Sequence, residues 1–210
     1  MNTSIGVSKP FIAVYSAGNG TPSYSGGKRL GMATAFSLDV QGSDPAILYA
    51  DNGPAEAVDM FSGGSGTVGV HKLSLSNLAL IRGQTVGSGS GSDANAVIFK
   101  ADANAPYMGV GVVSMVISGG QIRYLVVVNY KIKFRQPNVT LVTRGETVEY
   151  QVPELSFQVM RDDSADAKWM YMKEFETEAA AVAAIGTLLN IPSEEQTAAL
   201  NTSWTPPASA

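Results

Sequence analysis

The sequence predicts a mainly β protein in which many short strands are separated by turns. Glycine contributes 22 of the 210 residues and proline 10, while charged residues make up only 15%. β-Branched residues recur throughout, and several runs alternate apolar and polar residues with a period of two, which is typical of half-buried strands. A chain of this length corresponds to one large β domain, or to one domain with an appendage.

The low fraction of charged residues also indicates a surface that is poor in charge. Such a surface often meets another protein, because isolated monomers usually need charge to remain apart. The alternative is that serine, threonine, asparagine and glutamine supply enough polarity for a monomer. Composition alone leaves both readings open.

The N-terminal region is expected to begin with a polar arm over residues 1–9, followed by a short strand over 11–15 and turns over 18–27. Alternation then predicts a strand from Arg29 to Val40. Its even-numbered residues are mostly large and predict the core face, whereas its odd-numbered residues are mostly small. A face of small residues suits plain solvent exposure, and it also suits a wall along which something slides or against which another chain packs.

The motif Asp51-Asn52-Gly53-Pro54 separates two apolar runs and predicts a projecting loop, or an irregular hairpin, over residues 51–61. Farther along, alternation at Val68 and Val70 predicts a strand. A serine N-cap and a terminal glycine predict a short helix over residues 76–83, and the glycine and serine run at 87–93 is typical of a flexible loop.

Three strands are predicted over residues 96–101, 107–118 and 121–135, and Gly119-Gly120 predicts a tight hairpin between the last two. In the third strand, all the even-numbered residues from 124 to 134 are expected to share one face.

From residue 147 to 160 the apolar residues change from even to odd positions at Pro153, which predicts a bulge or bend. Glu149, Gln151 and Glu154 mark the polar face of this segment. Plain solvent exposure explains these side chains. The alternative is an acidic and polar lining that repels a polyanion within a Debye length of about 8 Å.

A strand over residues 169–175 and a helix from Thr177 to Asn190 complete the predicted domain, which spans residues 1–190. Thr177 is the expected N-cap, and the helix carries an apolar stripe that includes Ile185. Residues 191–210 are expected to form a polar tail with little to bury.

Charge and cysteine content exclude several classes of protein. The chain carries 18 acidic and 14 basic residues and no basic stripe, which argues against tight nucleic-acid binding. It has no cysteine, so disulfides and thiolate zinc sites are excluded. The N-terminal residues include no run that predicts a signal peptide or a membrane span, so we expect synthesis in the cytoplasm and no membrane partner.

No residues form a convincing catalytic, cofactor or metal site. His71 is the only histidine, and its neighbours predict a strand without a nucleophile elbow. The spacing of Gly64, Gly66 and Gly69 matches a dinucleotide fingerprint, but a strand follows instead of a helix. The acidic cluster in residues 162–166 predicts a solvated turn more than a calcium loop. We therefore expect no enzyme activity, no cofactor and no metal.

An ordered series of motifs resembles the major tail protein (tail tube protein) family of long-tailed bacteriophages of the siphophage type. The motifs are KPFIAVY from Lys9, YSGGKRLG at Tyr24 to Gly31, LYADNGPAE at Leu48 to Glu56, FSGG at Phe61 to Gly64, and GETVEYQVP at Gly145 to Pro153, followed by the Trp169 strand and the C-terminal helix. The resemblance implies a β-sandwich or barrel-like core with a flanking helix, similar to the tube protein of type VI secretion.

The resemblance also implies function and partners. Subunits of this family close into hexameric rings, and the rings stack into the tail tube through which DNA leaves the capsid. The implied partners are other copies of the chain, the tape measure, tail-tip and tail-terminator proteins, and genomic DNA in transit without specific binding. The implied location is the virion tail, with the host cytoplasm during assembly.

Within this hypothesis, two sets of residues are candidate sites. The expected inter-subunit contacts are Asp51, Asn52, Gly53, Val58, Met60 and Phe61. The expected lumen-facing residues are Ala33, Ala35, Ser37, Asp39, Glu149, Gln151 and Glu154. The alternative hypothesis is a monomeric β-sandwich that binds a ligand such as a carbohydrate, which would require exposed aromatic residues clustered on one face.

Overall fold

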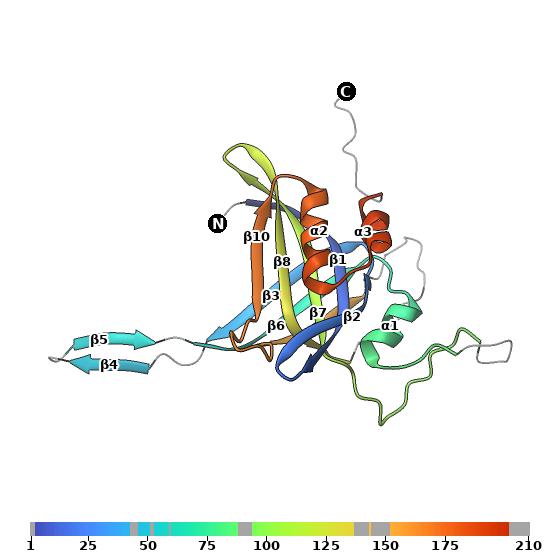
Figure 1. Cartoon of the computed structure of the whole chain (residues 1–210), viewed down its shortest axis with the longest axis horizontal. Coiled ribbons are helices and arrows are strands. Elements are labelled where there is room, and N and C mark those ends of the chain that lie inside the picture. The colour runs from blue at the N-terminus through green and yellow to red at the C-terminus, as the bar shows by residue number, and fades with distance from the viewer. Residues whose placement is uncertain are drawn as a thin grey trace.

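The computed structural model describes residues 3–42, 46–50, 53–58, 60–87, 94–136, 143 and 152–201, with only the backbone described for residues 3, 46–50 and 53–58. The protein is mainly β, as predicted. An eight-stranded antiparallel sheet, a separate two-stranded hairpin and three short helices make up the described part of the chain (Figure 1).

The large sheet has the strand order β2-β1-β7-β8-β9-β6-β3, and β10 pairs with β8 beside this path. Its strands are β1 (Thr3–Gly18), β2 (Thr21–Arg29), β3 (Ala33–Gly42), β6 (Phe61–Val70), β7 (Met108–Ser118), β8 (Gln121–Phe134), β9 (Glu154–Met160) and β10 (Met170–Phe175). The hairpin consists of β4 (Ala46–Ala50) and β5 (Gly53–Val58), and the helices are α1 (Leu75–Arg82), α2 (Glu178–Leu189) and α3 (Ser193–Leu200).

One face of the large sheet encloses an inner core. Its buried residues come from strands across the sheet and from α1: Ile12, Leu30, Val68, Val70, Ile81, Met108, Val110, Ile132, Phe134, Leu155, Phe157 and Val159. Because strands distant in the sheet order contribute to one cluster, the sheet must curve around it. Burying each large apolar side chain contributes about 1.5–3 kcal/mol, so this cluster is a major source of stability.

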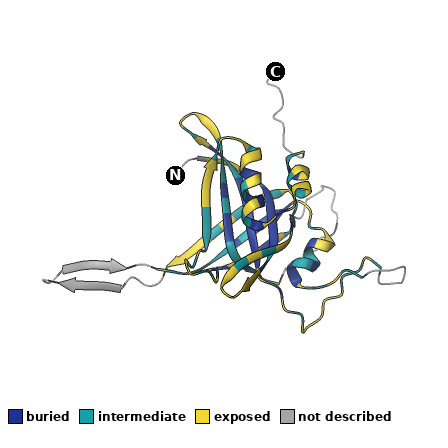
Figure 2. Ribbon diagram, viewed as in Figure 1, coloured by how far each residue is buried: buried dark blue, intermediate teal, exposed yellow. Residues whose placement is uncertain are grey.

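The other face of the sheet is covered by α2, which lies across β1, β7 and β8 (Figures 1 and 2). Two glycines of β7 let the helix approach closely. A Cβ atom at Gly111 would lie 2.8 Å from Ile185, and one at Gly109 would lie 2.6 Å from Leu189. The helix ends where the sequence predicts: Thr177 accepts a hydrogen bond from the Ala180 amide, and Asn190 takes the left-handed conformation.

Strand β8 contains a bulge that the sequence pattern does not reveal. Val110 of β7 pairs with Asn129, but Met108 pairs with Ile132, so β8 has one additional residue between these pairs. The expectation that all even-numbered residues from 124 to 134 share one face is therefore wrong. Val128 faces α2, whereas Ile132 lies in the inner core.

The N-terminal arm expected over residues 1–9 is also corrected. Residues from Thr3 onward belong to β1, which pairs with β7 along most of its length. Lys9 is only 2% exposed, and its Nζ lies 2.7 Å from Glu178 at the start of α2. The turns expected over 18–27 are reduced to Asn19 and Gly20, because Thr21 already begins β2.

The middle of the chain confirms some predictions and corrects others. Gly119 and Gly120 both have positive φ and join β7 to β8 in the predicted hairpin. The strand expected over residues 96–101 does not form; Val97 contributes only an isolated bridge to Val86. Helix α1 forms as predicted but starts slightly earlier, because its N-cap is Ser74, which accepts a hydrogen bond from the Asn77 amide.

The C-terminal region is folded beyond Asn190, where the prediction places only a polar tail. Helix α3 packs against α2 through Ala199, which is fully buried, and Ile191 is also buried in the same cluster. The Gln196 side chain donates a hydrogen bond to the Ile191 carbonyl. Acidic residues in the first turn of α3 are the sequence signal that indicates this helix, because they stabilise the positive end of a helix dipole.

The predicted projecting feature is a hairpin. Strands β4 and β5 pair with each other and not with the large sheet, and Figure 1 places them apart from it. The phase change expected at Pro153 is described only on its C-terminal side, where Leu155, Phe157 and Val159 are buried as predicted.

Candidate assembly surfaces

Strands β3, β6 and β9 lie side by side and present one polar face, which we call the polar wall. Paired residues form three rows across the strands: Ala35, Gly69 and Glu154; Ser37, Thr67 and Ser156; and Asp39, Ser65 and Gln158. The Ser37 and Thr67 hydroxyls lie 2.8 Å apart and share a hydrogen bond across β3 and β6. Small and polar side chains therefore cover three adjacent strands.

The opposite face of the same strands belongs to the inner core. Phe157 of β9 stacks on Phe36 of β3 at a centroid distance of 6.1 Å and meets Phe134 edge-on at 5.8 Å. Gly66 of β6 lies between these strands, and a Cβ atom there would be 2.5 Å from the Phe157 ring. The glycine thus provides the space that lets Phe157 lie against the sheet.

The polar wall is acidic to neutral. Strands β3, β6 and β9 contain no lysine or arginine, and Asp39 and Glu154 are their only charged residues. Both carboxylates are exposed. Basic residues of β8 and its end continue the face beyond β9. Lys131 pairs with Asp163 at 2.7 Å, Lys133 donates to the uncharged Asn104 side chain at 3.0 Å, and exposed Arg135 donates its backbone amide to Ser156 at 2.8 Å.

The structure brings together four of the residues that the sequence assigns to a lumen. Ala35, Ser37 and Asp39 lie on the polar wall with Glu154, although more than a hundred residues separate the two segments. Ala33 is half-buried and pairs with Val70. The register of β3 against β6 shifts between Ala33 and Ala35, so Ala33 does not continue the rows of the polar wall. The remaining two, Glu149 and Gln151, lie outside the described residues.

Sequence reasoning missed the middle of this face. Ser65 and Thr67 of β6 lie between the two predicted segments. Alternation places Thr67 opposite Val68 and Val70, but neither Thr67 nor Ser65 was assigned to the lumen, because the sequence does not show that β6 lies between β3 and β9.

The predicted inter-subunit residues have mixed positions. Met60 is 65% exposed. Phe61, however, begins β6 and stacks on Trp169 of its own chain, with parallel rings 4.5 Å apart. Gly53 is the first residue of β5 and Val58 is the last. The other two predicted contacts, Asp51 and Asn52, lie outside the described residues.

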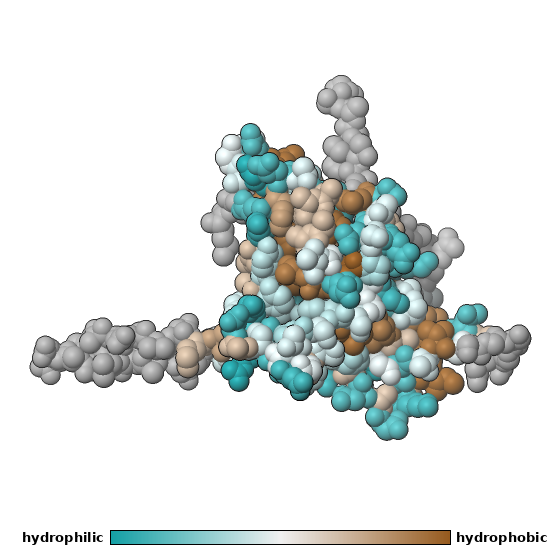
Figure 3. All heavy atoms as spheres, in the orientation of Figure 1, coloured by the Kyte–Doolittle hydropathy of each residue, from teal (hydrophilic) through white to brown (hydrophobic). Residues whose placement is uncertain are grey.

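Exposed apolar side chains gather at two further places. Ile5, Ile117 and Ile122 lie at the end of the sheet formed by β1, β7 and β8, where Ile117 pairs with Ile122. Met32 and Leu75 are about half exposed beside the start of α1, and Figure 3 shows hydrophobic surface near this helix.

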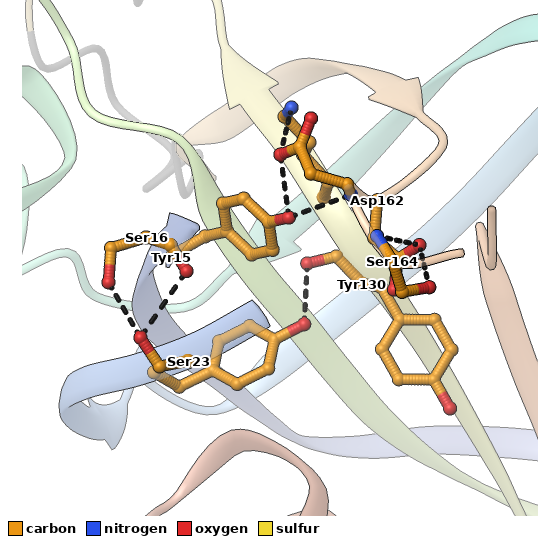
Figure 4. Close-up of polar contacts among 9 residues, drawn as sticks. Tyr15, Ser16, Ser23, Tyr130, Asp162 and Ser164 are labelled. Carbon is orange, nitrogen blue, oxygen red and sulfur yellow. Dashed lines mark hydrogen bonds and ion pairs between the residues drawn. The ribbon is translucent and has the colours of Figure 1, made fainter. Parts of the chain in front are cut away.

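A polar cluster fixes the loop between β9 and β10 to the sheet (Figure 4). The Tyr15 hydroxyl donates to Asp163 Oδ2 at 2.7 Å and accepts from the Asp163 amide at 2.9 Å. Lys131 donates to the same carboxylate oxygen. In the same loop Asp162 is buried and accepts hydrogen bonds from Ser164, so the turn is not simply solvated as expected.

These contacts shift two pKa values in directions that the geometry explains. Burial raises the pKa of Tyr15 to about 12. Hydrogen bonds from Lys131 and Tyr15 hold the pKa of Asp163 below its ordinary value. Both shifts favour the protonation states that the cluster needs at neutral pH, a neutral tyrosine and an ionised aspartate.

We expect Tyr15→Phe to lower the free energy of unfolding by about 1–3 kcal/mol at neutral pH, because it removes two hydrogen bonds and leaves the Asp163 amide unpaired. Chemical denaturation measures the change. Tyr171→Phe is the matched control, since the half-buried Tyr171 makes no hydroxyl hydrogen bond within the described residues. Equal stabilities of the two variants would contradict the role of the cluster.

The same cluster predicts a pH dependence. Because the pKa of Asp163 is lowered in the folded protein, its contribution to stability is present above the ordinary pKa and is lost as the pH falls through the lowered value. The stability difference between the wild-type protein and Asp163→Asn should therefore shrink below about pH 4. A difference that stays constant down to acid unfolding would contradict this assignment.

Metal and membrane sites are not evident in the described part of the chain. No group of three or more histidine, aspartate or glutamate side chains there could hold a metal ion. Among the same residues, no helix has the length and apolar character that a membrane crossing requires.

Comparison with known proteins adds no assignment. No protein-family model matches the chain, and no curated protein matches it.

Proposed function

We propose that this chain is a tail tube subunit of a long-tailed bacteriophage, which assembles into hexameric rings that stack into a conduit for DNA. The polar wall is the observation that carries the proposal. Its nine residues form a smooth surface without a basic residue, on the opposite side of the strands from a packed aromatic core. Such a surface suits the inside of a channel for a polyanion.

The electrostatics of the wall support passage of DNA without binding. Tight binding requires lysine or arginine to neutralise phosphates and release counterions. Asp39 and Glu154 instead repel phosphates at short range, and the remaining wall residues are uncharged. Small side chains at Ala35 and Ser37 leave the wall without large protrusions.

The edge of the sheet supports closure into a ring. Within the described residues, β3 is a ten-residue strand that pairs with β6 alone, and its other edge, which lies near β1 over part of its length, is the edge that we expect a strand of a second copy to pair with. Pairing around a ring would cover these edges and join the polar walls of neighbouring subunits into one lining. The hexameric number comes from the family resemblance.

Stacking of rings would use the projecting hairpin and the exposed apolar residues. Tape measure, tail-tip and terminator proteins would then set the length and ends of the tube in the virion tail, after assembly in the host cytoplasm. The alternative of a carbohydrate-binding monomer lacks comparable support. Trp169, the tryptophan among the described residues, is partly buried against the inner core and stacks on Phe61, so it is not an exposed aromatic residue of the kind that this alternative requires.

Concentration-dependent assembly tests the proposal. We expect the purified protein to be a monomer or small oligomer when dilute, and to form tubes of stacked rings when concentrated or supplied with a tail-tip initiator. Light scattering across a concentration series, with negative-stain microscopy of the same samples, measures this. An apparent mass of one subunit under every condition would contradict the proposed function.

A further inference from the structure

A cavity of about 350 Å³ opens at the junction of β2, β3 and α1. We call it the α1 pocket; residues that line it include Arg29, Leu30, Met32, His71, Lys72 and Ser74. None of its lining residues is acidic. The pocket thus combines apolar side chains, buried Leu30 and half-exposed Met32, with basic side chains.

Hydrogen bonds fix the walls of the α1 pocket. They join residues 29–32, at the end of β2 and just after it, to the segment after β6 and to α1. The His71 amide donates to the Met32 carbonyl at 2.8 Å. The side-chain amide of buried Asn77 donates to the Arg29 and Leu30 carbonyls at 3.0 and 2.9 Å. A preformed pocket loses little conformational freedom when a partner enters it.

The rim of the pocket carries one lysine that faces solvent, whereas Arg29 is half-buried and its backbone amide donates to Glu195 at 3.1 Å. Lys72 is exposed, and no ion pair is found for it within the described residues. Met32 is 50% exposed beside it, and Leu75, 55% exposed, follows in the first turn of α1. The matching occupant is therefore a segment that carries both carboxylates and apolar side chains.

The chain itself contains such a segment. Residues 43–60 include four carboxylates, at Asp44, Asp51, Glu56 and Asp59, and no lysine or arginine. The whole chain has 18 acidic and 14 basic residues, so the remainder has 14 of each and is neutral. The segment also contains Ile47, Leu48, Tyr49, Val58 and Met60. All the excess negative charge of the protein therefore lies in and beside the β4–β5 hairpin.

The hairpin and the pocket lie at opposite ends of the molecule in Figure 1, where β4 and β5 extend on one side and α1 lies on the other. The hairpin cannot reach the α1 pocket of its own chain in this arrangement. A second copy can supply it, and contact between two different surfaces of identical subunits produces a closed ring or an open filament, depending on the rotation between subunits.

We propose that the α1 pocket receives the acidic β4–β5 hairpin of a second copy of this chain. The inference rests on the proposed function and names the surface that its projecting hairpin binds. Charge attraction across this contact sets the direction in which subunits add, and the apolar side chains of both surfaces are buried when they meet.

A charge-swap experiment on the full-length protein tests the inference. Lys72→Glu reverses the rim of the pocket, and Glu56→Lys reverses a charge of the hairpin. We expect each single variant to remain folded but to raise the concentration needed for assembly by about tenfold or more, because like charges replace the opposite charges at positions 56 and 72 and the attraction between the two surfaces weakens. Lys173→Glu on β10 is the matched control, since this exposed lysine lies away from the pocket.

Mixing the two single variants sharpens the test. In an equimolar mixture, the unchanged hairpin of the Lys72→Glu variant meets the unchanged pocket of the Glu56→Lys variant. At the next contact, the lysine introduced into the hairpin meets the glutamate introduced at the pocket rim. At every contact in the mixture the charges at positions 56 and 72 are then opposite, so we expect the mixture, like the double variant, to assemble near the wild-type concentration.

The outcomes separate this inference from the proposed function. Tubes from the wild-type protein with unchanged assembly of both single variants would overturn the inference alone. Loss of assembly in a single variant without recovery in the mixture would also overturn it. A wild-type protein that never self-associates would overturn the proposed function, and this inference with it.

Discussion

Replacing Gly66 by valine is expected to lower the free energy of unfolding by about 3 kcal/mol or to prevent folding, the largest effect we expect from one substitution in the strands of the polar wall. A Cβ atom at this position would lie 2.5 Å from the Phe157 ring and 2.7 Å from the Ser37 carbonyl oxygen. The ring cannot withdraw freely, because it is fully buried between Phe36 and Phe134. Either the aromatic cluster or the pairing of β3 with β6 must therefore shift.

Chemical denaturation of Gly66→Val measures this effect, with Gly18→Val as the control. A Cβ atom at Gly18 would have no neighbour within 4 Å, so that substitution should change stability little. Shortening the clashing ring in a Gly66→Val, Phe157→Leu double variant should recover only part of the loss, because the contact with the Ser37 carbonyl remains. Similar unfolding midpoints for Gly66→Val and Gly18→Val would show that these strands tolerate the added bulk.

Asn129→Leu is expected to have the opposite sign and to raise the free energy of unfolding by about 1–2 kcal/mol. Asn129 is fully buried in β8, and neither its Oδ1 nor its Nδ2 has a hydrogen-bond partner within the described residues. It pairs with Val110, whose side chain belongs to the inner core. Leucine has the same branching and number of side-chain atoms, so it removes two unpaired polar groups without leaving a hole.

Thermal and chemical unfolding of Asn129→Leu, Asn129→Val and Asn129→Asp test this expectation together. Valine is smaller than leucine, so the valine variant removes the unpaired amide without the risk of overpacking the core. At least one of the two apolar variants should be more stable than the wild-type protein. Asn129→Asp should be strongly destabilised, because it buries an unpaired charge. If both apolar variants lose stability, the amide of Asn129 makes a contact that stabilises the fold.

Local signals explain which elements were predictable. Helix α2 has its N-cap, apolar stripe and C-terminal residue within a single short segment, so Thr177, Ile185 and Asn190 were assigned correctly. The Gly119-Gly120 hairpin and the buried positions Val68 and Val70 follow from patterns of two to four residues. Each of these features depends on contacts between neighbours in the sequence.

Other elements depend on partners far along the chain. Residues 3–9 look polar and isolated in the sequence, but they join β1 because β7, about a hundred residues later, pairs with them. The bulge in β8 is visible only in its register against β7. Helix α3 has few apolar residues, and its helical structure becomes evident where Ala199 is buried against α2.

The sequence by itself determined the mainly β class, the charge-poor surface, the helix after β10 and the small residues of β3, because these follow from composition and short-range periodicity. Only the tertiary structure decided that Ala35, Ser37 and Asp39 share a face with Glu154, with β6 between them. Alternation specifies which residues of a strand face the same way, but it does not specify the neighbouring strand. That choice is made by strand pairing across the whole sheet and by the core that the sheet encloses.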